Sequence, residues 1–256
     1  MGVLNVTPDS FSDGGRYVAI DAAVQHGLNM VAEGAAIIDV GGESTRPGAD
    51  PVTVQEELRR VVPVIEQLRR ATAAILSIDT SQPQVMQAAA VAGVDLINDI
   101  RALRISGAVS TARDSGCAVC LMHMRGEPAT MQRAPAYEDV VSEVGTFLRE
   151  RVAVCRDAGI AGDRLLIDPG FGFGKTLQHN LELLRRLREL AADVPVMVGL
   201  SRKSMAGRLT GRPPEQRLFG SVALAMLAVF KGARILRVHD VAATVDALNT
   251  LAAVED

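Results

Sequence analysis

The sequence predicts an α/β fold, a single (β/α)8 TIM barrel that spans residues 1–256. Eight short, near-continuous apolar runs alternate along the chain with longer amphipathic stretches. Continuous apolar runs are typical of parallel strands that are buried on both faces. The length of 256 residues also suits one α/β barrel, a fold of about 250 residues. An open, doubly wound sheet is the structural alternative, but eight similar units favour closure.

The apolar runs are the expected strands, and the amphipathic stretches are the expected helices. The runs are residues 3–6, 36–40, 74–78, 95–100, 118–122, 165–167, 195–198 and 235–238. The clearest helical stretches are residues 22–33, 54–69, 83–91, 137–157, 180–190 and 220–230. No linker or low-complexity segment divides the chain, so we expect one domain.

Composition and charge exclude several classes of protein. No apolar run approaches the roughly 18 residues of a membrane helix, and the N-terminus lacks the features of a signal peptide, so we expect a cytoplasmic protein without membrane contact. The net charge of −3 predicts no general attraction to nucleic acid. Three cysteines do not make a disulfide framework. Cys117 and Cys120 are expected on opposite faces of one strand rather than at a metal site.

Polar and glycine-rich segments follow almost every expected strand. In α/β barrels the carboxyl ends of the strands form the catalytic face. We therefore expect these segments to meet around one pocket: residues 5–15, 39–48, 79–80, 98–99, 122–124, 168–175, 201–204 and 239–240. The long segment 124–136 is expected to be a loop of this face that contains a short helix.

Asp79, Asn98 and Asp168 each end an apolar run. Two carboxylates and an amide suit a flat heterocycle with N–H donors on one edge, because paired hydrogen bonds to a carboxylate are strong and directional. Each residue could instead cap the following helix. That alternative is most open for Asp79, which lies four residues before Pro83.

A second group consists of Asn5, Arg46, Arg237 and His239. Arg237 and His239 flank Val238 in the last run, so alternation places both side chains on one face of that strand. Two arginines and a histidine at the barrel mouth would suit an anion such as a phosphate. A salt bridge at the barrel rim is the alternative role for Arg237.

Two further loops carry helix-capping or phosphate-like signals. The serines of loop 199–204 can cap the next helix, whose N-terminus would attract a phosphate or a carboxylate. Residues 169–176 resemble a P-loop only superficially, because three residues separate Gly170 from Gly174 and the P-loop fingerprint needs four. The phenylalanines of this segment are better explained as an apolar wall.

Taken in order, the motifs of the chain resemble those of the dihydropteroate synthase family. Residues 1–15 resemble its first signature, and residues 39–48 resemble its second. Shorter motifs recur at 77–80, 97–99, 121–124, 168–175, 201–204 and 237–240. The resemblance covers essentially the whole chain and is closest to bacterial, sulfonamide-sensitive members. Two departures are a first strand without the usual preceding segment and an unusual stretch at 101–107.

The resemblance implies a pterin-binding transferase of folate biosynthesis. Hydroxymethyl-dihydropterin pyrophosphate would condense with p-aminobenzoate to give dihydropteroate and pyrophosphate. The implied pterin-binding residues are Asp79, Asn98, Met122, Asp168, Phe173, Gly199 and Lys203. The implied aminobenzoate slot contains Phe11, Thr45, Pro47, Phe173 and Ser204. Pyrophosphate would be neutralised by Arg46, Arg237, His239 and a Mg²⁺ ion held by Asn5.

By the same resemblance, the residues with catalytic roles are Asp79, Lys203, Arg237 and His239. A homodimer and inhibition by sulfonamides are also implied. Two other functions stay open at this point. One is the methyltetrahydrofolate domain of corrinoid methyltransferases. It would share the pocket of two aspartates and an asparagine, but not the arginines and histidine expected to bind phosphate. The other is a catalytically silent paralogue that acts as a binding protein.

Overall fold

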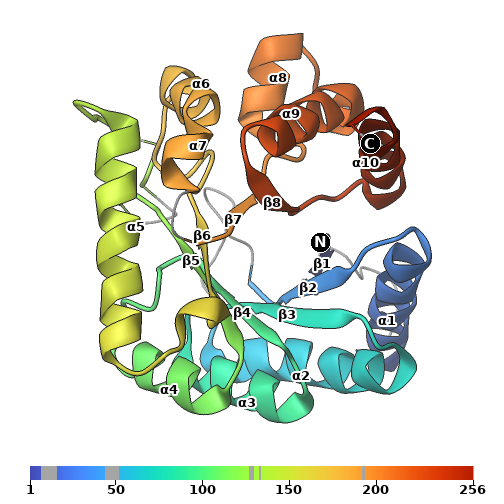
Figure 1. Cartoon of the computed structure of the whole chain (residues 1–256). Coiled ribbons are helices and arrows are strands. Elements are labelled where there is room, and N and C mark those ends of the chain that lie inside the picture. The colour runs from blue at the N-terminus through green and yellow to red at the C-terminus, as the bar shows by residue number, and fades with distance from the viewer. Residues whose placement is uncertain (7–15, 44–51, 127–129, 133, 192–193, 256) are drawn as a thin grey trace.

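The computed structural model is a (β/α)8 barrel, as the sequence predicts (Figure 1). It describes residues 1–6, 16–43, 52–126, 130–132, 134–191 and 194–255. Eight parallel strands follow one another in chain order, β1 to β8. Their bounds are β1 Gly2–Asn5, β2 Ile37–Gly41, β3 Ile75–Asp79, β4 Leu96–Asp99, β5 Ala118–Met122, β6 Leu165–Asp168, β7 Val196–Val198 and β8 Ala233–Leu236.

The barrel closes where the chain just beyond β8 meets β1. Val238 forms a parallel bridge with Gly2, and its carbonyl accepts a hydrogen bond of 3.0 Å from the Val3 amide. Closure removes the open sheet edges that a doubly wound sheet would keep. The open-sheet alternative is therefore excluded.

Helices surround the strands on the outside (Figure 1). The α-helices are α1 Arg16–Ala32, α2 Val54–Ala71, α3 Pro83–Ala92, α4 Ala108–Ser115, α5 Val140–Asp157, α6 Leu177–Arg185, α7 Leu187–Leu190, α8 Ser204–Thr210, α9 Leu218–Phe230 and α10 Val241–Glu255. Two short 3-10 helices, η2 Gly162–Arg164 and η3 Pro214–Gln216, precede β6 and α9.

Alternating residues of the strands pack into two separate apolar clusters. Outward-facing residues such as Ile38, Ile78 and Val119 pack with the helices in the larger cluster. Inward-facing residues form a small cluster inside the barrel, built from Leu96, Cys120 and Met197 with Met1, Ala118, Leu166 and Ile235 around them. The same alternation turns Asp79, Asn98 and Asp168, near the carboxyl ends of β3, β4 and β6, toward the barrel axis.

The cysteines behave as expected for structural residues. Cys117 belongs to the outer cluster and Cys120 to the inner one, so they lie on opposite faces of the β5 region. All three cysteines are free and buried.

Several expected boundaries are wrong in detail. The last strand is β8 at Ala233–Leu236, two residues earlier than the apolar run 235–238. The stretch 180–190 is two helices, because the backbone at Arg186 (φ −106°, ψ 21°) leaves the helical region between α6 and α7. Within the described part of 124–136 there is no helix.

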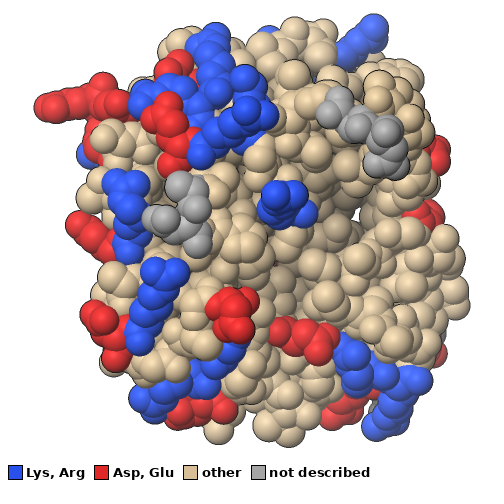
Figure 2. Space-filling view, in the orientation of Figure 1, with Lys and Arg blue, Asp and Glu red and all other residues tan. Residues whose placement is uncertain are grey.

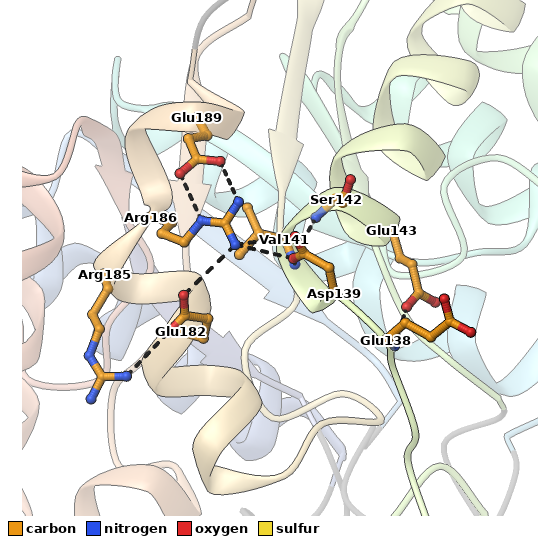
Figure 3. Close-up of polar contacts among 9 residues, drawn as sticks. All are labelled: Glu138, Asp139, Val141, Ser142, Glu143, Glu182, Arg185, Arg186 and Glu189. Atoms are coloured by element: carbon orange, nitrogen blue, oxygen red, sulfur yellow. Dashed lines mark hydrogen bonds and ion pairs between the residues drawn. The ribbon is translucent and has the colours of Figure 1, made fainter.

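The break at Arg186 is tied to the start of α5 by a polar network (Figure 3). The Arg186 guanidinium pairs with Glu189 at 2.7 Å and with Asp139 at 3.2 Å. Asp139 also caps α5, since its side chain accepts hydrogen bonds from the amides of Val141 and Ser142. Exposed pairs of this kind contribute little one at a time, but here a single guanidinium joins two elements.

The molecular surface mixes charges of both signs. Basic and acidic side chains lie close together around the edge of the face seen in Figure 2. Of the helices in the described residues, none is both long enough and apolar enough to cross a membrane.

Candidate active site

The polar residues predicted at the strand ends do lie together on the inner face of the barrel. Pairing aligns Gly41 of β2 with Asp79 of β3, and Asp79 with Asn98 of β4. On the far side of the mouth, Met122 of β5 is aligned with Asp168 of β6. Two carboxylates and an amide thus lie at the carboxyl ends of three strands, on the mouth side of the barrel.

Arg237 lies just after β8 and joins two carboxylates across the barrel. Its Nε is 2.6 Å from Asp39 Oδ2, and its Nη2 is 2.7 Å from Asp79 Oδ2. Burial opposes the guanidinium charge, but the two carboxylates outweigh it and raise the pKa of Arg237. The salt-bridge role that the sequence left open for Arg237 is therefore present, although it lies inside the mouth and not on an outer rim.

Asp79 is a strand-end carboxylate and does not cap a helix. The next helix, α3, begins at Pro83 with Gln82 as its N-cap residue and no side-chain cap. The capping alternative for Asp79 is therefore wrong. Burial and the nearby carboxylates raise the pKa of Asp79 to about 7, against the opposing effect of Arg237.

Asn98 is buried, and only one of the two polar atoms of its side chain has a hydrogen-bond partner. Its Nδ2 donates to Asp39 Oδ2 at 3.2 Å, while its Oδ1 has no partner. The neighbouring Asp99 turns the other way and fixes the following loop, accepting hydrogen bonds from the amides of Arg101 and Leu103. Asn98 therefore presents a free acceptor inside the barrel.

Asp168 faces the barrel axis at the end of β6. Its Oδ1 accepts a hydrogen bond of 2.7 Å from the amide of Gly170. Burial raises the pKa of Asp168, and Lys203 opposes that shift. Asp168 is thus a buried acceptor next to a lysine.

Beyond Asp168, the segment 170–174 turns its carbonyl groups toward side-chain donors. Every one of its five carbonyl oxygens accepts a side-chain hydrogen bond, from Lys175, Lys203, Gln132, Lys175 and Tyr137 in chain order. A P-loop instead offers its N–H groups to a phosphate. The arrangement of this loop therefore agrees with the rejection of nucleotide binding from the sequence.

Two glycines allow this loop to pack closely against the segment that follows β5. Gly170 and Gly174 have φ values of +69° and +63°. A Cβ at Gly170 would clash with the His123 carbonyl oxygen, and a Cβ at Gly174 would clash with that of Arg125. Both positions therefore require glycine for backbone conformation and for space.

Lys175 is buried beneath this loop and holds it. Its Nζ is 2.9 Å from Gly170 O, 3.0 Å from Phe173 O and 3.0 Å from His123 Nδ1. Burial lowers the pKa of Lys175 to about 7. Burial, followed by the charge of Lys175, lowers the pKa of His123 to about 2, so His123 is a neutral acceptor.

Lys203 closes the loop from the β7 side. Its Nζ donates to Phe171 O at 2.6 Å and lies 4.7 Å from the centre of the Phe173 ring, a cation–π contact. Burial lowers the pKa of Lys203 to about 8, although Asp168 opposes the shift. Phe173 also packs on an apolar cluster that lines the mouth, formed by Ile100, Met122, Met124 and Met131.

The loop after β7 differs from the expectation in its capping. Helix α8 begins at Ser204, its N-cap residue is Lys203, and no side chain caps it. The expectation that the serines cap this helix is wrong. Ser201 instead contacts His239, with 3.1 Å between its Oγ and His239 Nδ1. Gly199 lies at the foot of the loop, where an added Cβ would be 3.6 Å from Lys203 Nζ.

Asn5 lies at the end of β1, beside the Asp79 carboxylate. A Cβ added at Gly41 would be 3.8 Å from Asn5 Oδ1 and 3.9 Å from Asp79 Oδ2, so both oxygens border the space that this glycine leaves. Within the described residues, no group of three or more His, Cys, Asp or Glu side chains could hold a metal ion. Four predicted site residues lie outside the described part of the chain: Phe11, Thr45, Arg46 and Pro47.

Two cavities in the described structure lie on the outer wall, away from this mouth. One of about 480 Å³ borders α4 and α5 and is lined in part by Arg104, Arg113 and Arg151. Another of about 330 Å³ lies between α5 and α7. Neither is lined by a predicted site residue.

Sequence reasoning missed three residues that organise the mouth: Asp39, His123 and Lys175. Asp39 is a charged residue inside an apolar run, which is a usable signal for a functional role. His123 and Lys175 lie in segments that the sequence predicts at the mouth, but their roles depend on contacts between distant loops.

Together the described residues place several acceptors at the barrel mouth, with cations on two sides. Such an arrangement can bind a flat ring through its N–H groups and can stabilise charge that develops during a substitution. The family model for pterin binding enzymes matches residues 1–239 of the chain.

Similar curated sequences and solved structures identify the family within the pterin binding enzymes. Dihydropteroate synthase of Escherichia coli strain K12 is 53% identical over 254 residues, which cover 99% of this chain and 90% of that protein. The structure of the Xanthomonas albilineans enzyme with 4-aminobenzoic acid has a TM-score of 0.94 at 56% identity and covers 100% of this chain and 92% of that one. A Yersinia pestis dihydropteroate synthase with a sulfonamide drug has a TM-score of 0.94 at 52% identity, with coverage of 100% and 93%.

The chain therefore belongs to the dihydropteroate synthase family. Of the functions that the sequence left open, these relatives favour the synthase over the corrinoid methyltransferase domain.

Proposed function

We propose that this protein condenses hydroxymethyl-dihydropterin pyrophosphate with p-aminobenzoate, yielding dihydropteroate and pyrophosphate. A C–N bond forms between the arylamine nitrogen and the pterin methylene carbon. The C–O bond to pyrophosphate breaks, and the amine nitrogen loses a proton. The observation that carries the proposal is that Asp79, Asn98 and Asp168 lie at the carboxyl ends of their strands at the mouth, with Arg237 paired to Asp79.

The pterin ring is proposed to bind to Asp79, Asn98, Asp168 and Lys203. Asn98 Oδ1 and the carboxylates are acceptors for ring N–H groups. Met122, Phe173 and Gly199 would border the ring, since Phe173 and Met122 form the apolar wall of the mouth. As the leaving group departs, positive charge develops on the pterin methylene carbon, and the Asp79 carboxylate stabilises it.

The pyrophosphate is proposed to bind to Arg46, Arg237 and His239. Arg237 supplies a permanent positive charge at the mouth, and His239 is held by Ser201. Neutralising the charge of pyrophosphate makes it a better leaving group.

Mg²⁺ is the proposed cofactor, with Asn5 as its ligand. The oxygens of Asn5 and Asp79 around Gly41 fit a hard cation, which prefers oxygen donors and often shares its coordination with substrate phosphates. When bound, Mg²⁺ would neutralise pyrophosphate oxygens.

The aminobenzoate slot is proposed to lie beside Phe173 and Ser204, and to include Phe11, Thr45 and Pro47. An arylamine attacks carbon without prior deprotonation, so the slot needs no strong general base. This requirement agrees with a described mouth that holds carboxylates, an arginine and a lysine around the reacting centre.

A pyrophosphate-release assay tests the proposed function directly. Release should require both substrates together, and dihydropteroate should form in equal amount. Omission of Mg²⁺ should reduce the rate, and p-hydroxybenzoate, which lacks the amine, should not replace p-aminobenzoate. A folded protein that binds the pterin but releases no pyrophosphate would favour the silent paralogue.

Sulfonamides are proposed to compete with p-aminobenzoate. The motif residues Phe11, Thr45 and Pro47 are those of drug-sensitive family members, and 168–175 carries no inserted residue beside Phe173. Resistance requires bulk where the drug projects beyond the substrate. Sulfamethoxazole should raise the apparent KM for p-aminobenzoate in steady-state assays. No inhibition at a large excess of drug, in an active enzyme, would contradict this proposal.

We also propose that residues 1–256 form a single domain and that two copies associate through α9. Phe219, Leu227 and Phe230 are 85%, 49% and 47% exposed along this helix, an apolar surface that association would cover. Sedimentation should show a dimer, and Phe219→Asp should shift it toward monomer. The three free, buried cysteines are consistent with a reducing compartment and support a cytoplasmic location.

A further inference from the structure

Asp39 of β2 is a fully buried carboxylate to which the proposed reaction gives no role. Its Oδ2 accepts two hydrogen bonds, from Asn98 Nδ2 at 3.2 Å and from Arg237 Nε at 2.6 Å. Its Oδ1 has no partner. Asp39 thus contacts one residue of the proposed pterin set and one of the proposed pyrophosphate set.

The contact with Asp39 determines which way the Asn98 amide points. An ionised carboxylate accepts hydrogen bonds and cannot donate them. The amide of Asn98 must therefore direct its Nδ2 toward Asp39, which leaves Oδ1 facing away. Oδ1 is buried without a partner, and an unpaired buried acceptor is costly until a ligand donor reaches it.

We propose that Asp39 is a positioning residue that sets the hydrogen-bonding polarity of the pterin pocket. By fixing Asn98 as an acceptor, it selects rings that present an N–H donor at that point of the pocket. This inference rests on the proposed function and deepens it, since it assigns the determinant of ring specificity to a residue beneath the site.

The same carboxylate holds Arg237 from below. With Nε on Asp39 and Nη2 on Asp79, the guanidinium plane is fixed at two points. One buried side chain thereby fixes both the acceptor of the ring site and the cation beside it.

Asp39→Asn is the most direct variant because it keeps the shape and changes the chemistry. An amide at position 39 can present either an oxygen or an N–H group to Asn98, so the Asn98 amide is no longer held in one orientation. The matched control is Ser77→Ala. Ser77 is aligned with Asp39 in the next strand and is also fully buried, but its Oγ has no partner.

The experiment compares pteridines that differ in their N–H donors. Calorimetry measures Kd for 6-hydroxymethyl-7,8-dihydropterin, for its oxidised form, which lacks the N8–H donor, and for 6-hydroxymethyllumazine, which differs from the oxidised pterin in having an oxygen in place of the exocyclic amine and a hydrogen on N1. The wild type should prefer the donor-bearing ring in at least one pair. That ratio should fall about tenfold in Asp39→Asn and stay unchanged in Ser77→Ala.

The outcomes distinguish a failure of the proposed function from a failure of the proposed role of Asp39. A wild type that binds none of the three pteridines would contradict the proposed function. Wild-type discrimination that Asp39→Asn retains, with both affinities lowered equally, would overturn the role of Asp39 and leave the function intact. If Asp39→Asn does not fold, a wild-type crystal structure with the dihydropterin decides. The amide atom of Asn98 that does not touch Asp39 should face a ring N–H, and a ring acceptor there would overturn the inference.

Discussion

The two sides of the barrel mouth are built by different means. On the side of β2, β3, β4 and the residue after β8, charged groups lie on the strands and neutralise each other directly, as in the Asp39–Arg237–Asp79 contacts. On the side of β5, β6 and β7, a loop is held through its carbonyl oxygens by Lys175 and Lys203.

The difference shows which part of a site depends on side-chain charge and which on loop shape. Removing a charge from the strand side leaves a buried, uncompensated partner, so both stability and turnover should fall. Loosening the loop side should mainly shift Phe173 and Lys203 and weaken ligand binding. The predictions below test this contrast.

Arg237→Ala should have the largest effect. It leaves the carboxylates of Asp39 and Asp79 without their arginine partner, which should cost about 3–5 kcal/mol of unfolding free energy. It also removes the cation proposed for pyrophosphate, so kcat should fall about a hundredfold to a thousandfold. Denaturant unfolding and steady-state assays measure the two losses.

Arg234→Ala is the control, because Arg234 is an exposed residue of β8, three residues before Arg237. It should change neither quantity appreciably. An Arg237→Ala enzyme as stable as the wild type would show that the two carboxylates do not depend on this guanidinium.

Asp168→Asn should weaken binding of the bare pterin about tenfold. One acceptor oxygen becomes a donor, and the pocket then opposes a ring N–H. The hydrogen bond from the Gly170 amide can survive on the remaining oxygen, so the fold should be little affected. Calorimetry measures the affinity, with Asp163→Asn in the exposed turn before β6 as the control. Unchanged pterin affinity would show that Asp168 does not bind the pterin.

Lys175→Met should have a smaller effect. The KM for the pterin substrate should rise about fivefold. The variant removes a donor from the carbonyls of Gly170 and Phe173. The Gly170 carbonyl keeps the hydrogen bond from the Phe173 amide, but the Phe173 carbonyl loses its lysine donor, which should weaken the loop by about 1–3 kcal/mol. The KM for p-aminobenzoate should rise as well, since Phe173 borders both proposed subsites. Lys231→Met, which alters the remaining lysine at the end of α9, should leave both values near those of the wild type.

The pH dependence of stability should also report on Lys175. Its pKa is lowered from 10.5 to about 7, so between these values the folded chain holds fewer protons than the unfolded chain. Unfolding then takes up a proton, and this lysine makes the unfolding free energy rise with pH by up to about 1.4 kcal/mol per pH unit. The slope between pH 7.5 and 9.5 should be smaller in Lys175→Met. Equal slopes in the two proteins would mean that Lys175 stays fully protonated in the fold.

The residues at the strand ends could be predicted from the sequence on both sides of the mouth. Asp79, Asn98 and Asp168 end apolar runs, and strand alternation is enough to turn them inward. The apolar run 235–238 predicts the last strand two residues too late. The ladder with β7 ends at Leu236. Val238 is buried there through its bridge to β1, a contact between opposite ends of the chain.

For the loop side, the sequence predicted which segments meet at the mouth but not the contacts that hold them. The sequence shows the glycines of 170–174 but not why glycine is required there. Glycine is required because the His123 and Arg125 carbonyls lie close by, and this proximity depends on the packing of two loops. The roles of Lys175 and His123 follow from that packing. A local pattern cannot specify such contacts, because they join residues about 50 positions apart in sequence.

A crystal structure of the chain with bound dihydropterin pyrophosphate tests the central claim most directly. The account predicts that the ring spans the two sides of the mouth. Its N–H groups should lie within hydrogen-bonding distance of Asn98 Oδ1 and Asp168, and its pyrophosphate should lie near Arg237 and His239. A ring bound elsewhere, or one that touches only one side of the mouth, would contradict the account.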